Sequence, residues 1–167
     1  MELLLHELIH LVLSLLAAFF VYRLLKCKSY ISIVASIVGG FLIDIDHLVD
    51  YFFAFGIHFS LNYFLKGYQF LKSDRMYVPF HSWELVILLL IIFLIFSYFK
   101  NRIVLKTILL SFCIALFFHL ATDVILNRIS IKSYSFIYRL QKNFSLKELV
   151  SQIHYQKHLK QKKAVGL

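Results

Sequence analysis

Proline, cysteine and acidic residues are all scarce in this sequence. Together with the hydrophobic content, these shortages indicate which class of protein it belongs to. There is one proline in 167 residues, and only 9 residues are Asp or Glu against 18 that are Lys or Arg. In contrast, 60% of the residues are hydrophobic, 18 are Phe and 10 are Tyr, and the mean hydropathy is +0.77. This composition lies far from the average of soluble globular domains. The sequence therefore predicts a multi-pass integral protein of the cell membrane, the inner membrane in a bacterium.

The two cysteines, Cys27 and Cys113, lie far apart, one in a short loop and one inside a hydrophobic run. This spacing suggests neither a disulfide framework nor a thiolate metal site. The sequence also lacks a glycine-rich phosphate loop, a nucleophile elbow and a nucleic-acid-binding motif. A basic tail explains the net charge of +9, so the charge indicates anionic lipid and requires no nucleic acid partner.

Four hydrophobic runs approach the length of about 20 residues that a membrane-spanning helix needs. They cover residues 3–22, 30–47, 83–99 and 103–126. Glu2 and Glu7 stand where a cleavable signal sequence would carry positive charge, so we expect the first run to stay in the protein. Residues 32–40 of the second run form a ridge of small residues that favours close helix packing. The predicted fold class is all-α, an integral membrane four-helix bundle within a domain of residues 1–130.

Two further segments are predicted to lie at the membrane surface. Residues 48–80 are rich in Phe and Tyr, which indicates interfacial or re-entrant helices rather than a fifth span. Residues 131–167 form the predicted tail, where a capping box at 145–148 begins a basic amphipathic helix that continues through Val150 and Ile153. We expect His154 and His158 to lie in solvent on the polar face of this helix. The sequence leaves the oligomeric state open.

The second run ends in three acids and a histidine, namely Asp44, Asp46, His47 and Asp50. Carboxylates and imidazole beside hydrocarbon are costly unless a metal ion, a buried ion pair or a proton path compensates them. A simple helix cap would need only one acid. The Asp-x-Asp-His cluster at 44–47 therefore predicts a metal site.

Three other runs carry residues with metal-binding chemistry. The first contains His6-Glu7-Leu8-Ile9-His10, an H-E-x-x-H sequence that puts both imidazoles on one helix face, unless these residues only mark the entry of the helix into the membrane. His81 and Glu84 open the third run. His119 and Asp123 lie four residues apart in the fourth, where they either pair with each other or bind a metal.

The order of the runs brings these motifs to one side of the membrane. In an up-and-down bundle, the start of the first helix, the end of the second, the start of the third and the end of the fourth face the same side. All 9 acids and all 8 histidines lie on that side or in segments attached to it. We therefore expect one site, built from four helix ends at the membrane boundary.

The histidine before the first span, the Asp-Ile-Asp-His of 44–47, His81-Ser82 and the His119-x-x-x-Asp123 pair resemble the YdjM-type family. That family comprises membrane-bound, predicted metal-dependent hydrolases that are similar to zinc phospholipases C. The resemblance covers residues 1 to about 127, although Ile43 stands where the family usually has proline and the third motif reads His-Ser-Trp-Glu. It implies metal-site roles for His6 or His10, Asp44, Asp46, His47, His81, His119 and Asp123.

The implied chemistry is metal-assisted hydrolysis. Zinc suits imidazole and carboxylate ligands, and it would lower the pKa of a bound water toward about 7 beside an ester. The donors exceed the needs of one tetrahedral ion, so we expect one or two ions, with manganese or magnesium as alternatives to zinc. Glu84 or Glu7 would act as the general base or orient a ligand imidazole. The predicted substrate is a phospholipid or a lipid-linked phosphoester at the headgroup level of the bilayer.

Two alternative functions remain. An intramembrane zinc metalloprotease would use His6-Glu7-x-x-His10 with Glu7 as base, but it would give His81 and His119 no role and would need a later Asp-Gly motif that the sequence lacks. A non-catalytic metal-binding protein or carrier would need polar residues along the depth of the membrane. The midsections of the first, third and fourth runs are almost wholly apolar.

Overall fold

The computed structural model describes residues 3–99 and 101–167, with side chains from residue 5 onward. Every regular element in this part of the chain is a helix, which confirms the predicted all-α class. The helices fall into two compact units. The first unit holds the chain up to Asp44 together with Ser82–Leu126, and the second holds Ile45–His81 together with Asn127–Leu167.

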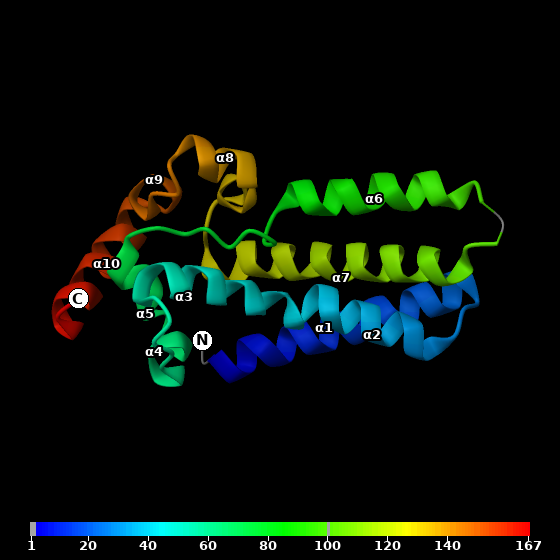
Figure 1. Ribbon diagram of the computed structural model, residues 1–167, viewed down its shortest axis with the longest axis horizontal. Coiled ribbons are helices and arrows are strands. Elements are labelled where there is room, and N and C mark those ends of the chain that lie inside the picture. The colour runs from blue at the N-terminus through cyan, green and yellow to red at the C-terminus, as the bar shows by residue number, and fades with distance from the viewer. Residues whose placement is uncertain (1–2, 100) are drawn as a thin grey trace. The chain divides into compact units, whose positions relative to one another are not determined.

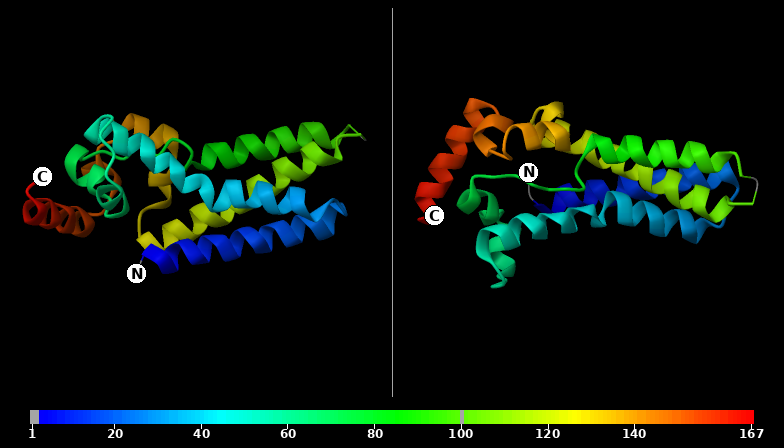
Figure 2. Two further views of the ribbon diagram at one scale, coloured as in Figure 1. Left: turned by 60° about the horizontal axis from the view of Figure 1, so that its bottom comes forward. Right: turned by 45° about the horizontal axis from the view of Figure 1, so that its top comes forward.

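Four long or intermediate helices make up the first unit, and they run alongside one another in Figures 1 and 2. They are α1 (Leu3–Leu25), α2 (Ser29–Gly40), α6 (Trp83–Ser97) and almost all of α7 (Ile103–Asn127). Both α1 and α7 are long and apolar enough to cross a membrane. With 15 residues, α6 rises only about 22 Å, which is less than the hydrocarbon thickness of about 30 Å.

Small polar side chains join α2 to its neighbours. The Ser32 hydroxyl donates a hydrogen bond to the Ala18 carbonyl at 2.6 Å and lies 3.1 Å from the Ser111 hydroxyl. One turn later, the Ser36 hydroxyl lies 3.4 Å from the Ser111 carbonyl oxygen. These contacts tie α2 to α1 and to α7, as the small-residue ridge predicts.

Gly39 and Gly40 let the end of α2 approach the adjacent helices closely. A Cβ atom at Gly39 would lie 2.8 Å from the Phe112 ring, and one at Gly40 would lie 2.4 Å from Ser14 Oγ and 3.0 Å from Ala115 Cβ. Real Cβ atoms do not tolerate such distances, so a side chain at either position would push the helices apart. The two glycines therefore fix where α2 ends against α1 and α7.

The second hydrophobic run is not one straight helix. It ends as α2 at Gly40 and continues as a 3₁₀ helix, η1 (Leu42–Asp46), and as α3 (His47–Phe55), with a bend of 43° between the parts. The prediction of a continuous helix over 30–47 is therefore wrong. Consecutive glycines weaken an α-helix, and the Gly40 carbonyl contacts a side chain of α7 instead of extending α2. Among the described helices two could span a membrane, or three if the bent pair is one span.

Short helices make up the second unit, and none of those described is long enough to span a membrane. Besides α3 they are α4 (Leu61–Leu65), α5 (Tyr68–Ser73), η2 (Ile131–Tyr134), α8 (Phe136–Gln141), α9 (Leu146–Leu149) and α10 (Gln152–Val165). The apolar core of this unit is formed by Met76, Val78, Leu146 and Leu149.

The C-terminal tail differs from its prediction in two respects. Instead of a continuous helix from residue 145, α9 ends at Leu149 and Val150 adopts an extended conformation before α10 begins. His158 is buried rather than solvated, because its Nε2 lies 2.7 Å from a carboxylate oxygen of Asp74. Lys162 Nζ bonds the other oxygen of the same carboxylate, so α10 is held on the end of α5.

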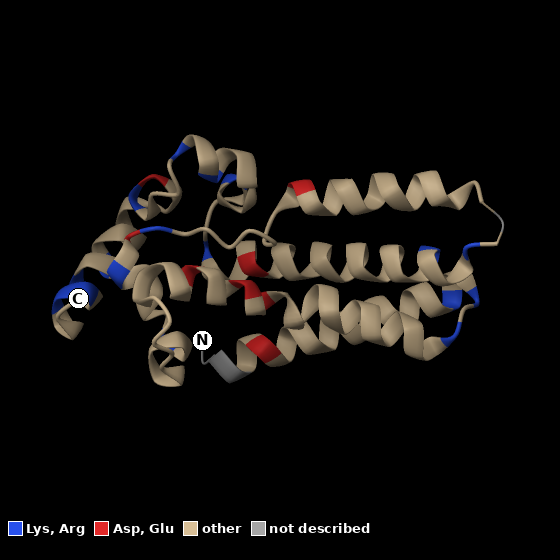
Figure 3. Cartoon of the chain, viewed as in Figure 1, with Lys and Arg blue, Asp and Glu red and all other residues tan. Residues whose placement is uncertain are grey.

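Charged residues are segregated within the first unit. Figure 3 shows its acidic residues at one end of its helices and its Lys and Arg residues at the opposite end. The acidic end contains the beginnings of α1 and α6 and the ends of α2 and α7.

Candidate metal centre

His119 of α7 lies between a carbonyl on one side of its ring and two carboxylates on the other. Its Nδ1 is 2.7 Å from the Gly40 carbonyl oxygen, and because a carbonyl only accepts, Nδ1 carries the proton. Its Nε2 is 3.4 Å from Asp123 Oδ2 and 3.6 Å from Asp44 Oδ1. In a neutral imidazole the Nε2 lone pair would then meet negatively charged oxygens. A cation is needed there, either a second proton on the ring or a metal ion.

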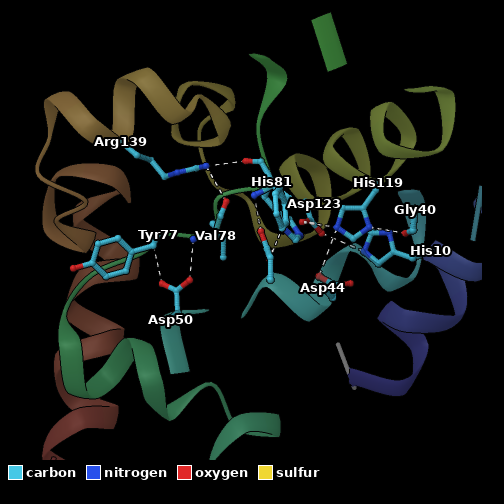
Figure 4. A network of polar contacts seen from close by, with 12 residues as sticks. His10, Gly40, Asp44, Asp50, Tyr77, Val78, His81, His119, Asp123 and Arg139 are labelled. Carbon is cyan, nitrogen blue, oxygen red and sulfur yellow. Dashed lines mark hydrogen bonds and ion pairs between the residues drawn. The ribbon is translucent and has the colours of Figure 1, made fainter. Parts of the chain in front are cut away.

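The two imidazoles of the H-E-x-x-H sequence contact the same carboxylate. Nε2 of His6 and Nε2 of His10 lie 3.1 Å and 3.3 Å from Asp123 Oδ1, and they are 2.9 Å from each other. The rings of His10 and His119 stack with their centroids 3.9 Å apart (Figure 4). The spacing of four residues places both histidines on one face of α1, as the sequence predicts.

These five residues form a largely buried cluster, which we call the first-unit cluster: His6, His10, Asp44, His119 and Asp123. His10 and His119 are each 1% exposed and Asp123 is 4% exposed, whereas the side chains of His6 and Asp44 are 16% and 22% exposed. Two carboxylates with neutral imidazoles carry a charge of −2, which a divalent cation would balance. His6 and Asp44 mark the open side of the cluster.

The distances within the cluster fit metal ligands. One donor atom from each of His6, His10 and Asp123 lies within 4.8 Å of the other two, and the same holds for His10, Asp44 and His119. Ligand atoms about 2.0–2.2 Å from a tetrahedral ion lie about 3.3–3.6 Å apart, whereas charge-assisted hydrogen bonds measure about 2.7–2.9 Å. The contacts of His119 with both carboxylates, at 3.4 and 3.6 Å, match the first range. These residues could hold a metal ion.

Asp46 and His81 form a pair in the second unit. Asp46 Oδ1 is 2.9 Å from His81 Nδ1, and Asp46 Oδ2 accepts a hydrogen bond from the Phe80 N–H at 2.8 Å. Both side chains are almost fully buried. A carboxylate on one ring nitrogen fixes the tautomer and makes the other nitrogen the one that binds a metal or substrate. This geometry suits Asp46 as the residue that orients His81.

Asp50 and Arg139 hold the same segment, residues 77–81, from two sides. The buried Asp50 carboxylate accepts hydrogen bonds from the N–H groups of Tyr77 and Val78 at 2.7 and 2.8 Å. Arg139 of α8, which is 0% exposed, donates to the carbonyls of Val78 and His81 at 3.0 and 2.9 Å. We call these two residues the clamp (Figure 4). The clamp fixes the backbone of residues 77–81, a segment that includes His81.

The predicted metal residues divide between the two units of the chain. The first-unit cluster contains five of them, and Asp46, His47 and His81 belong to the second unit. The His47 ring lies 5.0 Å from the His81 ring. Glu7 lies in α1 and Glu84 in the first turn of α6, both half-buried. The catalytic roles of Glu7 and Glu84 stay predictions. The same holds for direct metal binding by Asp46 and for one site built from four helix ends.

Arg139 was not predicted from the sequence. It lies in a short helix with no surrounding motif, and its partners Val78 and His81 are 61 and 58 residues away in the chain. Only the folded backbone shows why a cation is buried there.

Comparisons with protein-family models, with curated proteins and with solved structures found no match to this chain. The resemblance to the YdjM-type family therefore stays a prediction. The geometry of the described residues is the basis for a functional proposal.

Proposed function

We propose that this protein is a membrane-bound, metal-dependent hydrolase that acts on a phospholipid or a lipid-linked phosphoester. The observation that carries the proposal is the environment of His119, whose Nδ1 is committed to the Gly40 carbonyl while its Nε2 meets the carboxylates of Asp44 and Asp123. A buried arrangement of this kind is stable with a divalent cation between the donor atoms. The resemblance of the chain to the YdjM-type family, which is itself similar to zinc phospholipases C, is consistent with it.

The proposed ligands are the residues of the first-unit cluster, and the Gly40 carbonyl orients one of them. Backbone or carboxylate partners on the second nitrogen of a ligand imidazole typically strengthen metal binding. Zinc is the proposed ion, with manganese or magnesium as alternatives because two carboxylates contribute oxygen ligands. A bound ion of this kind supplies a Lewis acid and lowers the pKa of a water molecule. Glu7 or Glu84 would accept the proton from that water, and a second ion remains part of the proposal.

The proposed substrate follows from the place of the cluster along the helices. His6 lies near the beginning of a helix that could span the membrane, and Asp123 lies near the end of another. We propose that α1, the bent α2–α3 segment, α6 and α7 together form a four-helix membrane bundle, in which the cluster would lie at the headgroup level. Ester and phosphoester bonds of lipids occur at that depth. A water-soluble substrate would not require a site built at the ends of apolar helices.

The first experiment measures metal and hydrolysis in the same preparations. Purified protein should contain zinc or another divalent metal and should release a fluorescent product from a phospholipid analogue. His119→Ala should lose both the metal and the activity, because it removes a ligand. His154→Ala, on α10, is the matched control and should keep both. A folded preparation without metal that takes up neither zinc nor manganese would rule the proposal out.

One observation favours a second candidate, an intramembrane metalloprotease. Both imidazoles of the H-E-x-x-H sequence contact Asp123 Oδ1, and these three residues alone would form a zinc site with Glu7 beside it. In that case Glu7→Gln should abolish activity while leaving the metal bound, and His119→Ala should retain its metal. The hydrolase proposal expects the opposite result for His119→Ala. Asp123 is followed by Val124 rather than glycine, which favours the hydrolase.

A further inference from the structure

Residues 52–65 of the second unit expose an unusual number of large apolar side chains. Ile57 is 90% exposed, Phe53 is 67% exposed and Leu61 is 60% exposed. Phe52 and Leu65 are about half exposed as well, at 45% and 52%. We call these five residues the 52–65 surface. Soluble surfaces rarely concentrate so much apolar area in one short segment, so something other than water is expected to cover it.

A buried tyrosine fixes the loop that carries this surface. Tyr51 is 1% exposed, and its hydroxyl donates to the His58 carbonyl at 3.2 Å and accepts from the Ser60 N–H at 2.8 Å. Its ring contacts Phe55 and Phe59, with centroids 4.9 and 5.2 Å apart. These contacts fix both sides of the loop that carries Ile57. The contacts of Tyr51 with the loop therefore keep Ile57 exposed.

The turn at Gly56 contributes to the same result. Gly56 ends α3 with φ at +68°, a conformation that favours glycine, and its N–H bonds the Phe52 carbonyl at 2.8 Å. The helix therefore ends immediately before Ile57, and α4 follows at Leu61 (Figure 1). Leu61 and Leu65 are four residues apart and share one face of α4.

The charges around this surface match an anionic bilayer. Residues 51–73 contain no Asp or Glu, and their charged residues are Lys66 and Lys72. Lys72 Nζ lies 4.5 Å from the centroid of the Phe55 ring, and Lys66 Nζ lies 5.8 Å from that of the Tyr68 ring. Lysines that lie along aromatic rings beside an apolar surface are typical of the lipid headgroup region. An acidic protein partner would not require the highly exposed apolar side chain of Ile57.

The sequence also connects this surface directly to a candidate span. The bent pair Ser29–Gly40 and Leu42–Phe55 meets the length and hydropathy of a membrane span, and Gly56 follows it without a linker. The 52–65 surface therefore adjoins, in the chain, a segment that is apolar enough to enter a membrane. We propose that this surface inserts into one leaflet of a membrane that contains anionic phospholipids, with Lys66 and Lys72 at the phosphate level. This proposal does not depend on hydrolase activity.

The test uses a single tryptophan in the full chain, reconstituted in phosphatidylcholine vesicles with and without phosphatidylglycerol. Trp83→Phe removes the native tryptophan, and Ile57→Trp introduces the probe at an exposed position where it should not disturb packing. Lipid brominated on the acyl chain should quench the Ile57→Trp indole at least about twofold more than an indole at Lys132→Trp, an exposed position of the same unit. Iodide in the water should show the reverse order.

Two further measurements make the test decisive. Lys66→Gln with Lys72→Gln should remove the dependence of quenching on phosphatidylglycerol, whereas Lys132→Gln should not. Leu61→Trp repeats the depth measurement on α4 in case the first variant fails to fold. Equal iodide quenching at positions 57 and 132 would overturn the proposal. Shielding of position 57 from both iodide and brominated lipid would also overturn it, because a protein would then cover the surface.

Discussion

Two carboxylates of the first unit, those of Asp44 and Asp123, differ in their partners from two carboxylates of the second unit, those of Asp46 and Asp50. In the first unit, Asp44 and Asp123 meet imidazole nitrogens at 3.1–3.6 Å. In the second unit, both carboxylate oxygens of Asp50 accept hydrogen bonds from backbone N–H groups at 2.7 and 2.8 Å. Asp46 accepts one such bond at 2.8 Å and lies 2.9 Å from His81 Nδ1. The backbone therefore compensates the charge of Asp50, and partly that of Asp46, whereas the first-unit carboxylates need a cation.

This difference shows that closely spaced acids can serve opposite purposes. Asp44 and Asp46 are two residues apart in one motif, yet one faces a ligand-like imidazole and the other orients a histidine and a loop. Removing a first-unit carboxylate should act mainly on metal binding. Removing a member of the clamp should act mainly on folding, whether or not metal is present.

Loss of the clamp should have the larger effect on stability. Arg139→Gln would leave the buried carbonyls of Val78, His81 and Ser133 without their guanidinium donor. We expect it to cost roughly 3 kcal/mol or more of unfolding free energy, since each unsatisfied buried group costs about 1–3 kcal/mol. Denaturant unfolding with chelator present measures this cost. Lys132→Gln, which removes an exposed cation from the same unit, is the control, and equal stability of the two variants would contradict the role of the clamp.

Gly40→Ala should affect both stability and metal binding in the first unit. The new Cβ would lie 2.4 Å from Ser14 Oγ, and overpacking of this kind costs about 1–3 kcal/mol. It would also move the carbonyl that orients His119, so metal affinity should fall about 10–100-fold. Thermal unfolding and zinc titration measure the two effects. Adding Ser14→Ala should relieve part of the clash, and a double variant no better than Gly40→Ala would refute this explanation.

The long apolar helices and the pairing of histidines and acids on shared helix faces could be predicted because their signals are local. Hydrophobic runs specify α1 and α7, and spacings of four residues place His6 with His10 and His119 with Asp123 on shared faces. The break after Gly40 was missed, because the small-residue ridge that suits close packing also weakens the helix. The clamp and the burial of His158 could not be predicted, since their partners lie 27 to 84 residues away in the chain.

The smallest expected effect concerns the tail. Burial acts to raise the pKa of the Asp74 carboxyl, but hydrogen bonds from Lys162 and His158 outweigh it and hold that pKa below its ordinary value of 3.8. A carboxyl with a lowered folded-state pKa stabilises the fold above its unfolded pKa, and this contribution is lost as the pH falls through the folded value. The docking of α10 on α5 should therefore be constant near neutral pH and weaken below about pH 4.

Asp74→Asn should weaken the same docking at neutral pH by no more than about 1 kcal/mol, because the carboxylate is partly exposed to water. Protection factors from amide hydrogen exchange in residues 152–165 measure the free energy of this local opening, which should be lower in the variant and independent of pH in the acidic range. Glu148→Gln is the control, because the exposed Glu148 carboxylate makes a longer contact of 3.9 Å with Lys142 Nζ. This variant should leave exchange in α10 unchanged. If Asp74→Asn exchanges as slowly as the parent protein, apolar packing rather than the Asp74 ion pairs holds α10 in place.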